Sequence, residues 1–124
     1  MAKILLIDDS RFTRIKLTKF LQEKNFEVIE AENGQSGIAL ASSEQPDCII
    51  TDLLMPEMDG YAFLEQLKKD GLEIPVLVIT ADIQDTTRQK VLDLGAHAVL
   101  NKPADHAELH EMLTGVIAAR GAQP

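Results

Sequence analysis

Three aspartates and one lysine are the residues of this chain whose types and spacing could do chemistry. Each follows a short apolar run that is typical of a β-strand; they are Asp8, Asp9, Asp52 and Lys102. If these strands lie parallel in one sheet, the four side chains meet at its carboxyl edge, where open α/β sheets bind ligands. The three carboxylates would repel one another there, by roughly 4 kcal/mol per pair at about 4 Å with an effective dielectric of about 20. We therefore expect a divalent cation to share the pocket.

The rest of the sequence supplies the elements that would position these residues. Short β-branched runs alternate with longer helical patterns along the whole chain. Strands are expected at about 3–7, 27–31, 47–51, 75–80 and 97–101, and helices at about 10–24, 34–44, 60–70, 84–94 and 104–119. Uninterrupted apolar strands are typical of a parallel sheet that helices cover on both faces. The sequence thus predicts an α/β fold of (βα)5 type, a doubly wound five-stranded parallel sheet.

Length and charge limit the classes of function. With 124 residues the chain has the length of one domain, which we expect over 1–120 with a short tail at 121–124. The net charge of −8 argues against nucleic acid or an anionic membrane surface as a partner, because binding to phosphates needs clustered Lys and Arg. The partners are therefore expected to be proteins.

The single cysteine and the absence of long apolar stretches indicate a cellular location. Cys48 lies within an apolar strand pattern, where it is expected to be a small buried residue, and one cysteine excludes an intrachain disulfide. This usage is typical of a reducing compartment. The apolar stretch after Met1 is too short for a signal peptide or a membrane span. A cytoplasmic protein is expected.

Four short motifs follow one another along the chain, each at the end of a predicted strand. They are Ile-Asp-Asp at 7–9, the run from Asp52 to Gly60, Val-Ile-Thr-Ala at 78–81 and Asn-Lys-Pro at 101–103. Together, over the whole chain, they resemble the receiver domains of two-component response regulators, whose smallest members are single-domain CheY-like proteins. The resemblance implies the flavodoxin-like, CheY-like version of the predicted fold.

The resemblance implies a magnesium site at the acidic edge. Asp9, the Asp52 carboxylate and the backbone carbonyl of Leu54 would bind Mg²⁺ directly, and Asp8 would hold it mainly through water. These groups suit the ion, because Mg²⁺ takes oxygen ligands and usually keeps several waters. The cation would also offset the repulsion among the carboxylates.

The resemblance also implies that Asp52 is a phosphoacceptor, whose carboxylate attacks phosphorus and becomes an acyl phosphate. Lys102 would bind a phosphoryl oxygen, and before phosphorylation it can pair with Asp52. The bond from Lys102 to Pro103 is typically cis in the family. Thr80 would turn its hydroxyl toward the phosphoryl group. Charge-assisted contacts of this kind, worth about 1.5 to 3 kcal/mol each, form only in the modified state and are large enough to move a loop and a helix.

The function implied by the resemblance is signalling by phosphoryl transfer. The donor would be a phosphohistidine on a sensor histidine kinase or on a phosphotransfer protein, and a downstream protein would bind the modified chain. The chain would promote its own phosphorylation and dephosphorylation and would turn over no external metabolite, so it would not be an enzyme in the usual sense.

Two other classes of protein stay open at this point. An acidic, Mg²⁺-dependent phosphohydrolase with an aspartyl nucleophile is the alternative, but such phosphatases usually present Asp-x-Asp, and here Leu53 and Leu54 follow Asp52. A flavodoxin-like flavin binder would need a hydroxyl-rich phosphate loop after the first strand. Asp8 and Asp9 would repel that phosphate.

Two positions depart from the family pattern, and one face of the first helix stands out. Val99 occupies the place of an aromatic that turns inward when the threonine moves, and Ala104 replaces a bulkier residue after Lys-Pro. An aromatic switch is therefore excluded at Val99. On the helix at 10–24, Phe12 and Ile15 point away from the buried stripe. They are either ordinary exposed apolar residues or a docking patch near the acidic pocket.

The three histidines give only weak evidence for a second metal site. His106 and His110 lie one turn apart on the last helix but lack a third metal ligand at suitable spacing, so a solvated helix face is expected. His97 is expected at the surface at the start of a strand. We expect all three to lie away from the acidic edge.

Overall fold

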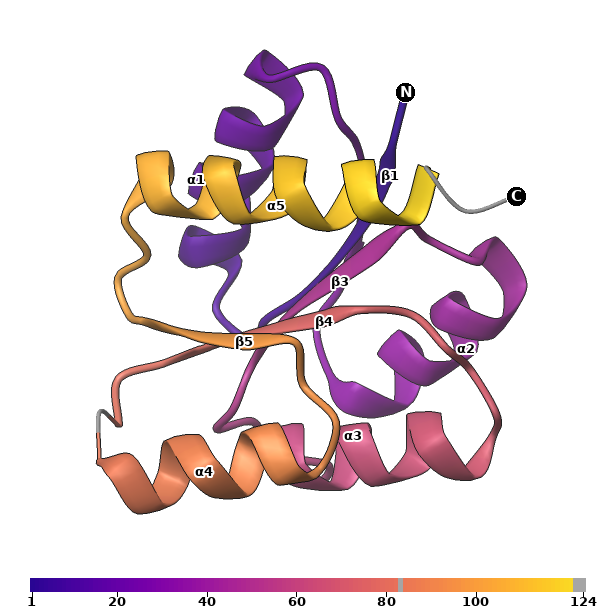
Figure 1. Cartoon of the computed structure of the whole chain (residues 1–124), viewed down its shortest axis with the longest axis vertical. Helices are drawn as coiled ribbons and strands as arrows, with labels where there is room; N and C mark the ends of the chain where they lie inside the picture. The colour runs from indigo at the N-terminus through magenta and orange to yellow at the C-terminus, as the bar shows by residue number, and fades with distance from the viewer. Residues whose placement is uncertain (83, 122–124) are drawn as a thin grey trace.

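Five parallel β-strands form one sheet between two layers of helices (Figure 1). The structure is a computed structural model that describes residues 1–82 and 84–121, and these counts refer to that part of the chain. The strands are β1 (Lys3–Ile7), β2 (Glu27–Ala31), β3 (Cys48–Asp52), β4 (Val76–Thr80) and β5 (Ala98–Asn101). The helices are α1 (Arg11–Glu23), α2 (Gly34–Glu44), α3 (Gly60–Lys69), α4 (Asp85–Asp93) and α5 (His106–Gly121). The strand order β2-β1-β3-β4-β5 confirms the predicted doubly wound (βα)5 fold.

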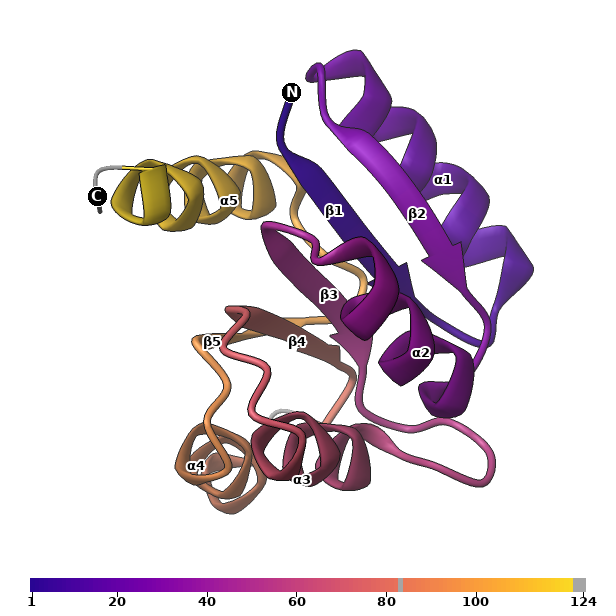
Figure 2. The ribbon, with the colours of Figure 1, turned by 90° about the vertical axis from the view of Figure 1, so that its right-hand side faces the viewer.

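Successive residues of the inner strands β1, β3 and β4 are buried against different helix layers. In β1, Ile4 and Leu6 pack toward α1 and α5, whereas Leu5 and Ile7 pack toward α2, α3 and α4. Figures 1 and 2 show these two layers on opposite faces of the sheet. All four side chains are at most 1% exposed. Because both faces are covered, the inner strands β1, β3 and β4 are mainly apolar, whereas the edge strand β2 carries the exposed Glu27 and Glu30.

The carboxyl ends of the inner strands lie together at one edge of the sheet. β3 extends one residue beyond its predicted end, because Asp52 pairs with Ile79 of the neighbouring strand β4. Thr80, the last residue of β4, pairs with Asn101, the last residue of β5. Asp8 follows β1 directly, and its N–H donates to the carbonyl of Ala31 at the end of β2, 3.1 Å away. The sheet register therefore brings the residues that could carry out chemistry to one edge.

Helix α5 begins two residues later than predicted. The carboxylate of Asp105 accepts the N–H of Glu108 at 3.0 Å, and this contact caps the first turn. The helix includes Gly121, the first residue of the predicted tail, and 122–124 lie outside the described residues. None of the helices in the described ranges is long and apolar enough to cross a bilayer.

Cys48 is the first residue of β3 and is fully buried, as its apolar surroundings in the sequence predicted. It forms no disulfide. Burial raises the pKa of its thiol to about 12, since the thiolate is disfavoured in an apolar environment. The sulfur is therefore a packing group in the described structure.

Gly60 sets the distance between α3 and the strand that carries Asp52. Its N–H donates to the carbonyl of Leu53 at 2.7 Å. A Cβ at this position would lie 2.9 Å from the Cα of Leu53 and 3.1 Å from the carbonyl oxygen of Asp52. Both of these are backbone atoms, which cannot turn aside as a flexible side chain can. The absence of a side chain thus allows α3 to begin directly against the site.

We predict that Gly60→Ala lowers the free energy of unfolding by about 1 to 3 kcal/mol, because the methyl group forces α3 away from β3. Gly115→Ala is the matched control, since a Cβ on that residue of α5 meets no atom within 4 Å. The control should gain about 0.5 to 1 kcal/mol from its higher helix propensity. Urea denaturation of both variants measures the difference, and equal stability of the two would contradict the proposed contact.

Candidate functional site

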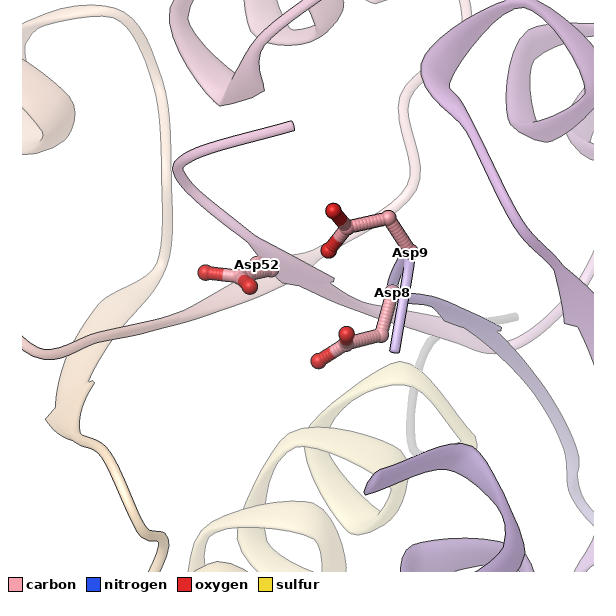
Figure 3. Close-up of side chains that lie close together, drawn as sticks. All are labelled: Asp8, Asp9 and Asp52. Carbon is pink, nitrogen blue, oxygen red and sulfur yellow. The ribbon is translucent and has the colours of Figure 1, made fainter. Parts of the chain in front are cut away.

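Asp8, Asp9 and Asp52 form a cluster, the acidic trio. Each offers a carboxylate oxygen, and the three oxygens lie within 4.8 Å of one another. Figure 3 shows the three carboxylates on the same side of the strand ends, around a common space. Asp8 and Asp52 are buried, at 4% and 8% exposed, and Asp9 is exposed. The structure thus brings together the three aspartates that the sequence singled out, in an oxygen-only set that suits a hard cation.

Lys102 lies against the acidic trio. Its Nζ donates to Oδ2 of Asp52 at 2.7 Å and to Oδ2 of Asp8 at 3.3 Å. Partial burial acts to lower the pKa of Lys102, but the hydrogen bond and charge of Asp52, followed by those of Asp8, outweigh it and raise the pKa above 10.5. The ammonium is therefore charged at neutral pH and screens two of the three carboxylates. The bond to Pro103 is cis, as the family resemblance implied.

The other oxygen of Asp52 is also bonded. Its Oδ1 accepts the N–H of Leu53 at 2.7 Å. Leu54, whose carbonyl is the remaining predicted ligand, follows in the loop between β3 and α3, and its side chain is 65% exposed. Glu57 in the same loop has a positive φ of 67°, so this loop turns back toward α3 within a few residues.

Asp8 is held at each of its polar groups. Oδ1 accepts the N–H of Ser10 at 2.8 Å, Oδ2 accepts from Lys102, and the carbonyl accepts from Arg14. Burial raises the pKa of Asp8; the Ser10 N–H and Lys102 act in the opposite direction, and the charge of Asp52 adds to the increase. In the structure Asp8 therefore carries an electrostatic cost that a cation would relieve.

Arg14 is a residue that the sequence analysis missed. It lies on α1, donates to the carbonyl of Asp8 and forms an ion pair with Glu30 of β2 at 3.2 Å. It thereby joins α1, β2 and the chain segment that carries Asp8 and Asp9. A lone arginine within a helix pattern gave no signal for this contact, because the contact depends on how β1 and α1 are connected.

Thr80 is fully buried at the carboxyl end of β4, next to the strand that ends with Asp52. Its hydroxyl oxygen accepts the N–H of Asp82 at 3.1 Å. The predicted residue is therefore at the same edge of the sheet, with its hydroxyl bonded to the β4–α4 loop in this structure.

A cavity of about 150 Å³ opens beside the acidic trio, between α1 and the start of α5. Its polar wall includes Asp8, Asp52 and Lys102, and its apolar wall includes Phe12 and Ala104. Ala104, one of the two departures from the family pattern noted in the sequence, thus borders this cavity.

His106 is exposed, as predicted for a solvated helix face, but the prediction that it lies away from the acidic edge was wrong. This residue lines the same cavity as Asp52, because α5 begins there, directly after the loop that carries Lys102. The ring of His106 stacks on Phe20 with centroids 4.3 Å apart, and His110 meets Phe20 edge-on at 6.5 Å. Among the described residues, the acidic trio is the group found that could hold a metal ion, and no histidine belongs to it.

Comparisons with known proteins identify the family. The chain matches the family model of the response regulator receiver domain over residues 4–114. It is 38% identical over 120 residues to protein PilH of Pseudomonas aeruginosa, covering 95% of this chain and 99% of PilH. It is 36% identical over 107 residues to the response regulator MprA of Mycolicibacterium vanbaalenii, covering 86% of this chain but only 46% of MprA.

Solved structures agree with this assignment. The N-terminal domain of an uncharacterized protein from Wolinella succinogenes has a TM-score of 0.91 at 31% identity, over 100% of both chains. The chemotaxis protein CheY4 of Vibrio cholerae has a TM-score of 0.87 at 31% identity, over 94% of this chain and 98% of that one. Fold and site thus define a receiver domain of CheY-like architecture. The chain belongs to the response regulator receiver domain family, whose members are signalling proteins of two-component systems. The comparisons do not favour the phosphohydrolase alternative.

We predict that Asp8→Asn stabilises the chain when divalent cations are absent. The amide keeps an oxygen for the Ser10 N–H, gives up the bond from Lys102 and removes a buried charge near Asp52. Because the folded-state pKa of Asp8 is raised above 3.8, its ionised form costs stability at neutral pH, and this cost disappears as the pH falls through the folded pKa. The variant should exceed the wild type by on the order of 1 kcal/mol in free energy of unfolding at neutral pH.

Urea denaturation in EDTA measures the difference in free energy of unfolding between the variant and the wild type. Repeated at decreasing pH, it should show that this difference becomes smaller. Addition of Mg²⁺ should stabilise the wild type more than the variant, because a ligand stabilises the folded state according to its affinity. A variant that is less stable than the wild type in EDTA at neutral pH would show that the Asp8 charge is not a cost.

Proposed function

We propose that this receiver domain accepts a phosphoryl group on Asp52 from a phosphohistidine, with Mg²⁺ held in the acidic trio, and that a downstream protein reads the modified surface. The observation that carries the proposal is the placement of Asp52: it lies among two further carboxylates and is bonded to Lys102 at 2.7 Å. A nucleophilic carboxylate, a cation for a phosphoryl oxygen and an oxygen-only metal site are the parts that this transfer needs.

The donor set fits magnesium. Asp9, Asp52 and the carbonyl of Leu54 would bind the ion, with Asp8 acting mainly through water. The oxygens of the acidic trio lie within 4.8 Å of one another, so they are close enough to share one cation after a small contraction. When bound, the cation supplies positive charge that offsets the carboxylates and the charge on the transferred group.

Asp52, Lys102 and Thr80 have separate roles in the phosphoryl transfer. An oxygen of Asp52 attacks phosphorus, the nitrogen–phosphorus bond of the donor breaks, and the imidazole leaves with the electron pair of that bond. Lys102 exchanges its bond to the Asp52 carboxylate for one to a phosphoryl oxygen, and its raised pKa keeps it protonated for this purpose. Thr80 donates its hydroxyl to another phosphoryl oxygen. In this scheme the chain promotes reactions of its own aspartate and turns over no external metabolite.

The cellular setting follows from the same proposal. Donors would be a sensor histidine kinase or a phosphotransfer protein, in a phosphorelay or in chemotaxis-type signalling, and we place them with this chain in the cytoplasm. The sequence argument for a reducing compartment, a single buried cysteine, supports that location.

The exposed apolar residues of α1 fit a donor surface. Phe12 and Ile15 are 70% and 55% exposed, and Leu54 on the other side of the site is 65% exposed. Phe12 also lines the cavity that reaches Asp52. We assign the docking patch to Phe12 and Ile15 because exposed apolar side chains next to a reactive group favour contact with a protein.

The decisive experiment is phosphorylation by acetyl phosphate in the presence of Mg²⁺. Intact-mass spectrometry should detect the added mass of one phosphoryl group on the wild type and none on Asp52→Asn. Asp93→Asn, an exposed residue of α4, is the control and should be modified as the wild type is. An unmodified wild type, or an adduct of equal yield on Asp52→Asn, would overturn the proposal.

Phe12→Ala separates docking from chemistry. Transfer from a phosphorylated histidine kinase should slow by about tenfold or more, which is the effect of truncating an aromatic anchor at an interface. The rate with acetyl phosphate should stay at the wild-type value, because Phe12 bonds to none of the groups at Asp52. Equal transfer rates for variant and wild type would show that this ring plays no part in docking.

A further inference from the structure

The β4–α4 connection contains a continuous set of hydrogen bonds that starts at Thr80. The hydroxyl oxygen of Thr80 accepts the N–H of Asp82 at 3.1 Å. The Asp82 carboxylate accepts the N–H of Gln84 at 3.0 Å through Oδ1 and the hydroxyl of Thr87 at 2.7 Å through Oδ2. Thr87 is buried in the first turn of α4. These bonds connect the predicted phosphoryl contact to a helix.

The side chain of Asp82 caps α4. The residue at the cap position, Gln84, gives the helix no side-chain hydrogen bond. Asp82 supplies an acceptor from two residues earlier, and the bonds from Gln84 and Thr87 lower the pKa of its carboxylate. Both oxygens of Asp82 are therefore committed to the start of α4, and the carboxylate stays ionised at neutral pH.

The same bonds restrict Thr80. Its hydroxyl oxygen bonds to the loop, so turning it toward a phosphoryl group gives up the N–H of Asp82. That N–H belongs to Asp82, whose side chain is bonded to Gln84 and Thr87, so a shift of Asp82 would also strain or break these bonds. A second bond, from Arg88 Nη1 to the carbonyl of Val99 at 3.2 Å, holds α4 to β5.

We propose that Asp82 and Thr87 are positioning residues that act through Thr80. In the unmodified chain they keep the Thr80 hydroxyl bonded to Asp82. On phosphorylation, when this hydroxyl turns away, they transmit the change to the first turn of α4. This inference rests on the proposed function. It assigns the coupling between Thr80 and α4 to the Asp82–Thr87 bond, because Val99 has no aromatic ring that could move with Thr80.

The test compares two adjacent threonines of α4. Thr87→Val removes the hydroxyl that bonds Asp82 and keeps the shape of the side chain, whereas Thr86→Val changes an exposed neighbour in the same turn. Amide NMR spectra of the full chain are recorded with Mg²⁺, before and after addition of beryllofluoride as the phosphoryl mimic. Thermal unfolding checks that both variants are folded.

The wild type and Thr86→Val should show displaced amides around Asp52 and along α4. Thr87→Val should keep the response around Asp52 while the displacement of the α4 amides is reduced, because Asp82 is then no longer bonded to the first turn of the helix. If the Asp82–Thr87 bond only capped the helix, the amide displacement along α4 relative to that around Asp52 would be the same in Thr87→Val as in the wild type. Asp82→Asn keeps the acceptor for Gln84 and offers Thr87 a donor instead, so it should give a smaller loss of the same kind.

The outcomes separate the two proposals. If the wild type responds in both regions and Thr87→Val and Asp82→Asn do so equally, the positioning role is overturned and the proposed function stands. If the wild type shows no response around Asp52, the proposed function fails, and the positioning role falls with it.

Discussion

Carboxylates whose oxygens lie within 4.8 Å of one another repel, and two of the three in this chain are buried. Lys102 offsets part of this repulsion, with bonds to Asp52 and Asp8, and backbone N–H groups offset another part. What is left favours any partner that brings positive charge into the site. The stability of the resting chain therefore depends on this electrostatic arrangement.

The sheet makes this arrangement possible without distortion of the strands. Parallel strands end at a common edge, so residues far apart in sequence reach one pocket through register alone: Asp52 is opposite Ile79, and Thr80 is opposite Asn101. Helices on both faces exclude water below that edge. Gly60 allows α3 to start against the strand of Asp52.

Much of this organisation was predictable from the sequence, because it depends on local patterns. Apolar runs gave the five strands, and the positions of Asp8, Asp52 and Lys102 after those runs placed them at one edge. The contacts of Arg14 and of the Asp82 side chain were not predictable. They depend on the dihedral angles of short connections, which residue types alone do not determine. His106 was misplaced for a related reason, since its distance from the site depends on the residue at which α5 starts.

Cys48 has a consequence for how the motions of this chain can be followed. Its sulfur is inaccessible at the start of the middle strand, and burial keeps the thiol protonated at neutral pH. A thiol introduced on the outside of a helix would therefore be the one that reacts with a maleimide dye or a nitroxide, with the native cysteine left in place. The chain thus already has the background that site-directed labelling normally has to create by mutation.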